Sequence, residues 1–107
     1  MTEEKKLFVD WLNANYDFSS KKLVTDCASR VWKLEAAFKA SFGNSFSFED
    51  EYEKDKGASV MALFARAGHN DEAAKLKEGT LPIGSKQMYP LKSALKKYFE
   101  YLASQDQ

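Results

Sequence analysis

The chain has 107 residues, of which 44% are hydrophobic, 14% are aromatic and 30% are charged. This length is usual for one domain, and this composition excludes a chain that is disordered throughout. Sixteen Lys and Arg residues balance sixteen Asp and Glu residues, so any basic surface that could bind nucleic acid or a membrane has to be local. We therefore expect a single folded domain that spans residues 1–107.

The N-terminal segment does not resemble a signal peptide, because acidic residues stand where positive ones are required. The sequence holds no run of about eighteen apolar residues that could cross a bilayer. Cys27 is the only cysteine, which indicates a reducing compartment. We expect a cytoplasmic protein without membrane contact, and Met1 favours a complete small protein.

The first predicted helix begins at Thr2, where Glu3 and Glu4 suit the positive end of the helix dipole. Residues 13–18 are expected to connect it to the next helix. Its apolar residues are expected on one side: Leu7, Phe8, Trp11 and Leu12.

The second helix has the clearest pattern, because its apolar residues recur at steps of three and four. Ser19 or Ser20 can cap its N-terminus through a hydroxyl, and Gly43 can end it in a left-handed conformation. One apolar stripe is expected: Leu23, Val24, Cys27, Val31, Leu34, Phe38 and Phe42.

Short helices are expected in the middle of the chain. Ser47 followed by Asp50 is typical of a capping box and predicts a helix from Phe48 to about Lys54.

Two more short helices are predicted after it. One covers residues 59–67 and ends at Gly68, and the other begins at a cap on Asn70 and ends at Gly79. Residues 80–85 show no periodicity and are expected to form a surface loop.

The last predicted helix covers residues 88–103. Pro90 lies in its first turn, where a missing amide costs nothing. Its apolar residues keep helical spacing: Leu91, Ala94, Leu95, Tyr98, Phe99 and Leu102. The predicted fold is therefore all-α, a compact bundle of five to six helices.

No catalytic constellation is recognisable. Cys27 lies on the apolar stripe with no cation expected on its own helix face, so we interpret it as structural. His69 follows a helix end, where its imidazole is expected to bond terminal carbonyls. We expect no enzyme activity, cofactor, metal site or small-molecule substrate.

An acidic run follows Phe48. It lacks the ligand spacing of a calcium loop. It can be the solvated face of a short helix or a surface that docks on a basic partner. The candidate partner-binding residues are Glu49, Asp50, Glu51 and Glu53.

The C-terminal part is locally basic. No acidic residue occurs between Glu78 and Glu100, whereas this stretch contains Lys86 and Lys97. Lys92 and Lys96 lie one helical turn apart, opposite the apolar stripe, and could follow a phosphate backbone. The second helix adds basic residues on its polar side: Lys22, Arg30 and Lys33. Such residues are either solubilising charge or DNA contacts.

Three segments carry a family resemblance: FVDWL from Phe8, SSKKLVTDCASRV from Ser19 and PLKSALKKYFEYL from Pro90. The chain resembles at both ends the N-terminal, SAM-like core-binding domain of tyrosine recombinases and phage integrases. The resemblance implies a helical bundle that holds duplex DNA through phosphate contacts. It implies Arg30, Lys33, Lys92 and Lys96 as contacts, whereas the catalytic half of a recombinase is absent.

Two functions follow as hypotheses. The first is a non-enzymatic DNA-binding module in the manner of an integrase core-binding domain. The alternative is a small phage or mobile-element protein that binds and inhibits a host protein through an acidic and aromatic surface.

Overall fold

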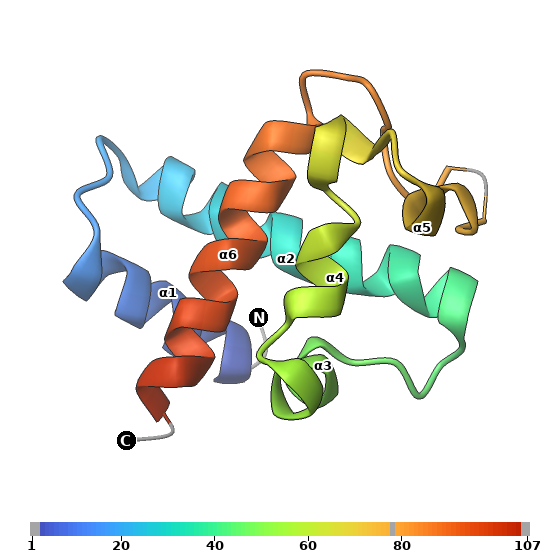
Figure 1. Cartoon of the computed structure of the whole chain (residues 1–107). Coiled ribbons are helices and arrows are strands. Elements are labelled where there is room, and N and C mark those ends of the chain that lie inside the picture. The colour runs from blue at the N-terminus through green and yellow to red at the C-terminus, as the bar shows by residue number, and fades with distance from the viewer. Residues whose placement is uncertain (1–2, 78, 106–107) are drawn as a thin grey trace.

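The computed structural model describes residues 3–77 and 79–105 (Figure 1). Within this part the chain is all-α, with no strand, as the sequence predicts. Its elements are α1 (Glu3–Asn15), α2 (Lys21–Phe42), α3 (Phe48–Asp55), α4 (Ala58–Ala62), the 3₁₀ helix η1 (Ala65–Gly68), α5 (Asp71–Ala74) and α6 (Met88–Gln105). The radius of gyration of 13.6 Å is close to the value of about 13 Å expected for a compact chain of this length.

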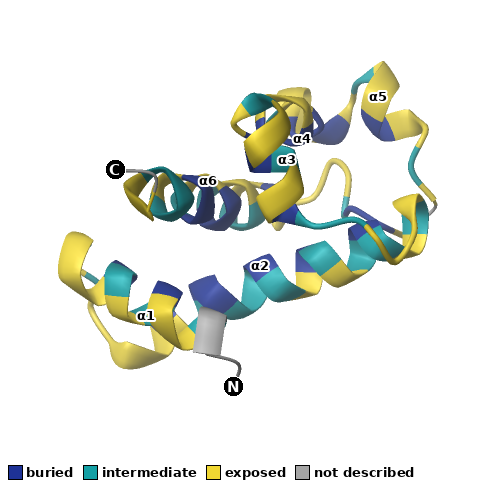
Figure 2. Ribbon diagram, turned by 90° about the horizontal axis from the view of Figure 1, so that it is seen from below, coloured by how far each residue is buried: buried dark blue, intermediate teal, exposed yellow. Residues whose placement is uncertain are grey.

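The helices form two layers, with α1 and α2 in one and α3, α4 and α6 in the other (Figure 2). Helix α6 packs against α1, α2, α3, α4 and η1, so it connects the two layers. The buried faces of α2 and α6 are turned toward each other (Figure 2). On α2 the buried residues are Val24, Cys27, Ala28, Val31, Leu34 and Phe38, and on α6 they are Met88, Ala94, Leu95, Tyr98 and Phe99.

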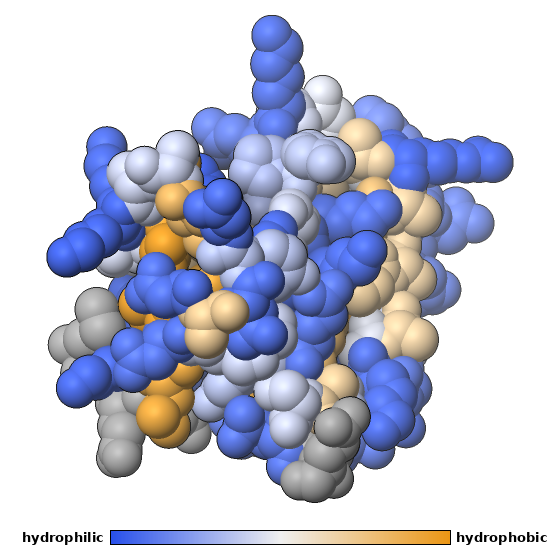
Figure 3. Space-filling view, turned by 90° about the vertical axis from the view of Figure 1, so that its left-hand side faces the viewer, coloured by the Kyte–Doolittle hydropathy of each residue, from blue (hydrophilic) through white to orange (hydrophobic). Residues whose placement is uncertain are grey.

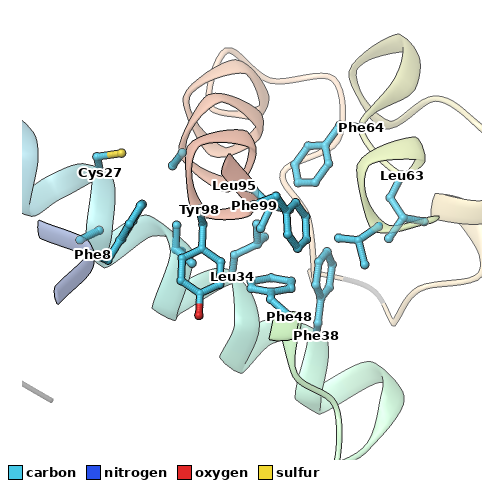
Figure 4. Close-up of a cluster of buried hydrophobic side chains, with 14 of the residues drawn as sticks. Phe8, Cys27, Leu34, Phe38, Phe48, Leu63, Phe64, Leu95, Tyr98 and Phe99 are labelled. Atoms are coloured by element: carbon cyan, nitrogen blue, oxygen red, sulfur yellow. The ribbon is translucent and has the colours of Figure 1, made fainter. Parts of the chain in front are cut away.

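Aromatic rings fill the space between the layers (Figure 4). Phe48 is fully buried and meets Phe38 edge-on at 5.8 Å and Phe99 at 6.0 Å between ring centroids. At the other end of the core, Phe8 meets Tyr98 edge-on at 5.1 Å. Such ring pairs each contribute about 1 kcal/mol beyond the area they bury, so the rings hold α1, α2, α3 and α6 in one core.

The ends of the predicted apolar stripes are exposed, which corrects the sequence analysis. Leu7 on α1 is 49% exposed, and Leu23 and Phe42, near the two ends of α2, are 44% and 54% exposed. The reason is that α6 covers only the central turns of the 22-residue helix α2. Trp11 is half-buried, while Phe8 and Leu12 are fully buried as expected.

Helix α2 begins and ends near the predicted residues. The Ser20 hydroxyl accepts the Leu23 backbone N–H at 3.3 Å, so Ser20 rather than Ser19 is the cap. Gly43 ends the helix with a φ of 110°. Its ψ of 160° is extended, so the left-handed helical conformation that we expected is not the one adopted.

Helix α3 is confirmed to within one residue. The Ser47 hydroxyl accepts the Asp50 N–H at 3.1 Å, which is the predicted cap. A second contact was not predicted: the Glu35 carboxylate, on α2, accepts the Phe48 N–H at 2.9 Å. The first turn of α3 is therefore bonded to α2 directly above the buried Phe48 ring.

The predicted helix over residues 59–67 is wrong in its second half. Helix α4 ends at Ala62, and Arg66 and Ala67 both have a left-handed φ of 55°. The Asn70 side-chain amide donates to the carbonyls of Leu63 at 3.0 Å and Ala65 at 2.9 Å. In a continuing helix these carbonyls would accept backbone N–H groups of the next turn. The Asn70 amide takes the place of those N–H groups, so the helix stops.

The helix predicted to reach Gly79 is also shorter. Asn70 caps α5 as expected, since its carbonyl oxygen accepts the Ala73 N–H at 2.8 Å. The helix ends at Ala74, and the following chain is bonded to α2. There the Ser41 hydroxyl accepts the Lys77 N–H at 3.0 Å and lies 2.7 Å from the Thr80 hydroxyl.

The loop over residues 80–85 is not a surface loop at its start, because Thr80 and Leu81 are buried.

Helix α6 extends two residues past the predicted end. None of the described helices has the length and apolar content needed to cross a bilayer.

The cap on α2 gives a test of this assignment. We expect Ser20→Ala to lower the free energy of unfolding by about 1 kcal/mol, because the Leu23 N–H loses its acceptor. Ser19→Ala should change it by less than about 0.5 kcal/mol. Urea denaturation of both variants measures the difference, and equal losses would contradict the cap.

Gly57 gives a second test, because it combines a φ of 82° with a close approach to Phe99. A Cβ at this position would lie 2.5–2.7 Å from three carbons of the buried Phe99 ring. We expect Gly57→Ala to cost about 3 kcal/mol, the sum of backbone strain and overpacking. Gly79→Ala is the matched control, since Gly79 has a φ of 86° and a Cβ there would meet no atom within 4 Å. We expect this control to lose about 1 kcal/mol. Thermal unfolding measures both variants.

Candidate nucleic-acid interface

The outward face of α6 carries a shallow groove of about 420 Å³. Burial of Leu95, Tyr98 and Phe99 fixes the rotation of the helix, so residues at steps of three and four on the other side face solvent. The residues that line the groove are Tyr16, Tyr89, Lys92, Ser93, Lys96, Lys97 and Glu100. We call it the α6 groove.

Lys92 and Lys96 are exposed in this groove. They lie one turn apart, about 6 Å along the helix axis. Neither makes a salt bridge to any residue in the described part of the chain. Both ammonium groups are therefore available to an anion without breaking an internal pair.

Lys97 is held in place on the same face. Its Nζ donates to the Ser93 hydroxyl at 2.7 Å and lies 5.0 Å from the centre of the Tyr16 ring. The Tyr16 hydroxyl donates to the Glu100 carboxylate. Glu100 is the one acid that lines the groove, and this bond engages its carboxylate.

The bond to Glu100 has an electrostatic consequence. A carboxylate that accepts the phenol proton disfavours loss of that proton. This hydrogen bond, with a smaller contribution from burial, raises the pKa of Tyr16 from 10.0 to about 12. Tyr16 therefore stays neutral and keeps its ring beneath the Lys97 ammonium at every ordinary pH.

Tyr89 is 79% exposed, the highest value among the described large hydrophobic residues. A second hollow, of about 240 Å³, shares Tyr89 and Lys92 with the α6 groove and adds Arg66 and Lys86. An exposed aromatic ring amid cations is a surface on which bases or sugars can pack while cations hold phosphates. The two hollows form one basic surface around Tyr89. Figure 3, which views the molecule from the side of the α1–α2 connection, shows many hydrophilic side chains and, at the left, an orange hydrophobic patch.

The structure brings together only some of the predicted contacts. Lys92 and Lys96 line the α6 groove, whereas Lys22, Arg30 and Lys33 do not line it. Lys22 and Lys33 are exposed on α2, and Arg30 is half-buried.

The sequence does not predict Tyr16, Tyr89 or Arg66 as site residues, although they line the two hollows. Tyr89 precedes Lys92 by three residues, so the spacing that placed Lys92 and Lys96 on one face could have included it. Arg66 could not be found, because its position depends on the break in the helix made by Asn70.

Cys27 is 5% exposed, and burial raises the pKa of its thiol. Two cations oppose that rise in pKa: Lys97 on α6, which the expectation for the helix face did not cover, and Arg30 on α2 itself. Burial is nevertheless the largest cause, so the structural interpretation of Cys27 holds.

The prediction for His69 is wrong in its detail. Its backbone N–H bonds the Arg66 carbonyl at 3.0 Å, whereas the exposed imidazole lies beside Gly84. Within residues 3–77 and 79–105 the imidazole bonds no carbonyl.

The acidic run is divided by the geometry of α3. Glu49, Asp50 and Glu53 are exposed, while Glu51 is half-buried and turns toward α4 and α5. In the described residues no three His, Cys, Asp or Glu side chains lie close enough to hold a metal ion.

No protein-family model, curated protein or solved structure matches this chain.

The Tyr16–Glu100 bond makes stability depend on pH at the alkaline end. In the unfolded chain Tyr16 titrates near 10, below its folded pKa of about 12. Its contribution to stability is therefore complete below about pH 10 and is lost as the pH rises to about 12. We expect the free energy of unfolding to fall more steeply over this pH range in the wild type than in Tyr16→Phe. The difference should be only a fraction of what the full pKa shift would give, because the Tyr16 side chain is partly exposed.

Tyr89→Phe is the matched control, because Tyr89 has no such partner in the described residues. Denaturant unfolding at several alkaline pH values measures both variants. If the free energy of unfolding falls with pH as steeply in Tyr16→Phe as in the wild type, the hydrogen bond to Glu100 does not hold the Tyr16 proton.

Proposed function

We propose that this protein is a non-enzymatic DNA-binding module that holds duplex DNA along the outward face of α6. One observation carries the proposal: Lys92 and Lys96 stand exposed, without internal ion pairs among the described residues, beside the exposed ring of Tyr89. Lysines that release counterions from phosphates supply most of the affinity of such contacts.

The charges around Tyr89 suit a strand of phosphates. Lys92 and Lys96 follow the helix axis, and Arg66 and Lys86 continue the basic surface past the helix start. None of these groups reads a base edge by itself, so the contacts position DNA with little sequence preference. The left-handed φ of 55° at Arg66 also supports a functional role for this surface, because strained backbone tends to occur at functional sites.

The family resemblance supports the same surface. The PLKSALKKYFEYL segment that resembles an integrase core-binding domain is the body of α6. By that resemblance α2 would supply a second set of contacts through Arg30 and Lys33, and Lys22 on the same helix is a further candidate. The SAM-like arrangement and the use of both helices are therefore parts of the proposal.

The test is binding of a fluorescein-labelled DNA duplex, followed by anisotropy across a salt series between about 50 and 200 mM. We expect affinity to fall steeply with salt in the wild type. In Lys92→Gln/Lys96→Gln the slope of log affinity against log salt should become shallower by about 1.8, because two phosphate contacts are lost. Binding should weaken for all duplex sequences alike.

The matched control is Lys6→Gln/Lys54→Gln, which removes the same charge from exposed positions on α1 and α3. It should keep the wild-type slope. An absence of binding at low salt, or an equal loss in the control, would overturn the proposal. The variant Lys22→Gln/Lys33→Gln then tests whether α2 contributes to DNA binding. If it does, the slope of log affinity against log salt decreases further.

A further inference from the structure

A second groove lies between the C-terminal end of α2 and helices α3, α4 and α5. Its volume is about 490 Å³, and it shares no lining residue with the α6 groove. Phe42, Phe46 and Leu63 form its apolar part, and Glu51, Lys54 and Glu72 are its charged residues. We call it the Phe42 groove.

The aromatic part of this groove is rigid on one side and exposed on the other. The rings of Phe42 and Phe46 are stacked, with centroids 5.3 Å apart and planes at 26°. Phe46 is held by edge contacts to Phe38 and to Phe48 in the core, whereas Phe42 is 54% exposed. A partner that covers Phe42 would meet an ordered surface and lose little additional conformational entropy.

The charge around the groove selects the chemistry of its occupant. Of the five carboxylates of α3, Glu51 lines the groove, and Glu72 in the first turn of α5 is the second carboxylate there. One lysine, Lys54, belongs to the lining, so the carboxylates are in excess by one charge. Lys75 pairs with Glu72 at 3.3 Å, but both side chains are highly exposed, so the pair is weak and can be exchanged. The resulting negative potential repels phosphates and attracts Lys and Arg.

We propose that the Phe42 groove binds a short amphipathic segment of a protein partner. Its apolar side chains lie against Phe42 and the partly exposed Phe46, and its Lys or Arg side chains face Glu51 and Glu72. Apolar residues with flanking charge are the usual features of peptide docking in a shallow groove. This proposal is independent of DNA binding, since the two surfaces have no residue in common.

The proposal also refines the acidic surface expected from the sequence. Of the four predicted partner-binding acids only Glu51 lines the groove. Glu49 and Glu53 lie on the other side of α3, and Asp50 donates its N–H to the Ser47 cap. The aromatic residues and Glu72 replace them as the expected contacts.

The experiment uses the whole chain as bait and random linear peptides displayed on phage as the probe. Enriched peptides are synthesised with a fluorescent label, and their affinity is measured by anisotropy. We expect apolar residues interspersed with Lys or Arg. Phe42→Ser should weaken their binding by about tenfold or more, and Glu51→Gln/Glu72→Gln should weaken it by a few-fold and remove its salt dependence.

Leu23→Ser is the matched control, since Leu23 is an exposed apolar residue, 44% accessible, near the opposite end of the same helix. It should keep wild-type affinity, and thermal unfolding of both variants verifies that each is folded. The proposal is overturned if no peptide is enriched, if the enriched peptides are acidic, or if Phe42→Ser binds them as the wild type does. It is also overturned if sedimentation shows a wild-type dimer that Phe42→Ser dissociates, because the occupant is then a second copy of the chain.

Discussion

Phe48 lies where α2, α3 and α6 meet, with its ring edge-on to Phe38 and Phe99 and its backbone N–H bonded to the Glu35 carboxylate. Packing and hydrogen bonding act here at the same residue. The ring sets the distance between the two layers, and the hydrogen bond sets where α3 begins. Because α3 leads directly into α4, this position also fixes where the chain enters the less regular region that follows.

The rotation of α6 follows from this packing, and with it the face that is left for function. Leu95, Tyr98 and Phe99 must point inward to meet the rings of the core. A helix cannot bury these positions without presenting Lys92, Lys96 and Lys97 on its outer side. The basic surface is thus a geometric consequence of the core, and only the choice of lysine at those outer positions is free.

The sequence predicts the long helices well, because their burial is periodic and their caps are local. The spacing of Val31, Leu34 and Phe38 is enough to orient α2. Residues 58–77 and 79–81 follow different rules. There the Asn70 side chain bonds the carbonyls of Leu63 and Ala65, and Ser41 of α2 accepts the Lys77 N–H. Such side-chain contacts leave no periodic signal. For the same reason the common face of Lys92 and Lys96 could be predicted, but the extension of the basic surface to Arg66 could not.

A net charge of zero conceals a separation of charge within the fold. Glu51 of α3 and Glu72 of α5 line the Phe42 groove, while Lys92, Lys96 and Lys97 of α6 line the groove that holds Tyr89. At the ionic strength of a cell, charges act over about 8 Å, so each surface presents its own sign to a ligand. On the proposed function, the acidic side would repel a DNA duplex that extended over it, so the duplex would lie away from α3 and α5. Overall charge is therefore a poor guide to what this chain binds, because its helices sort the charges by face.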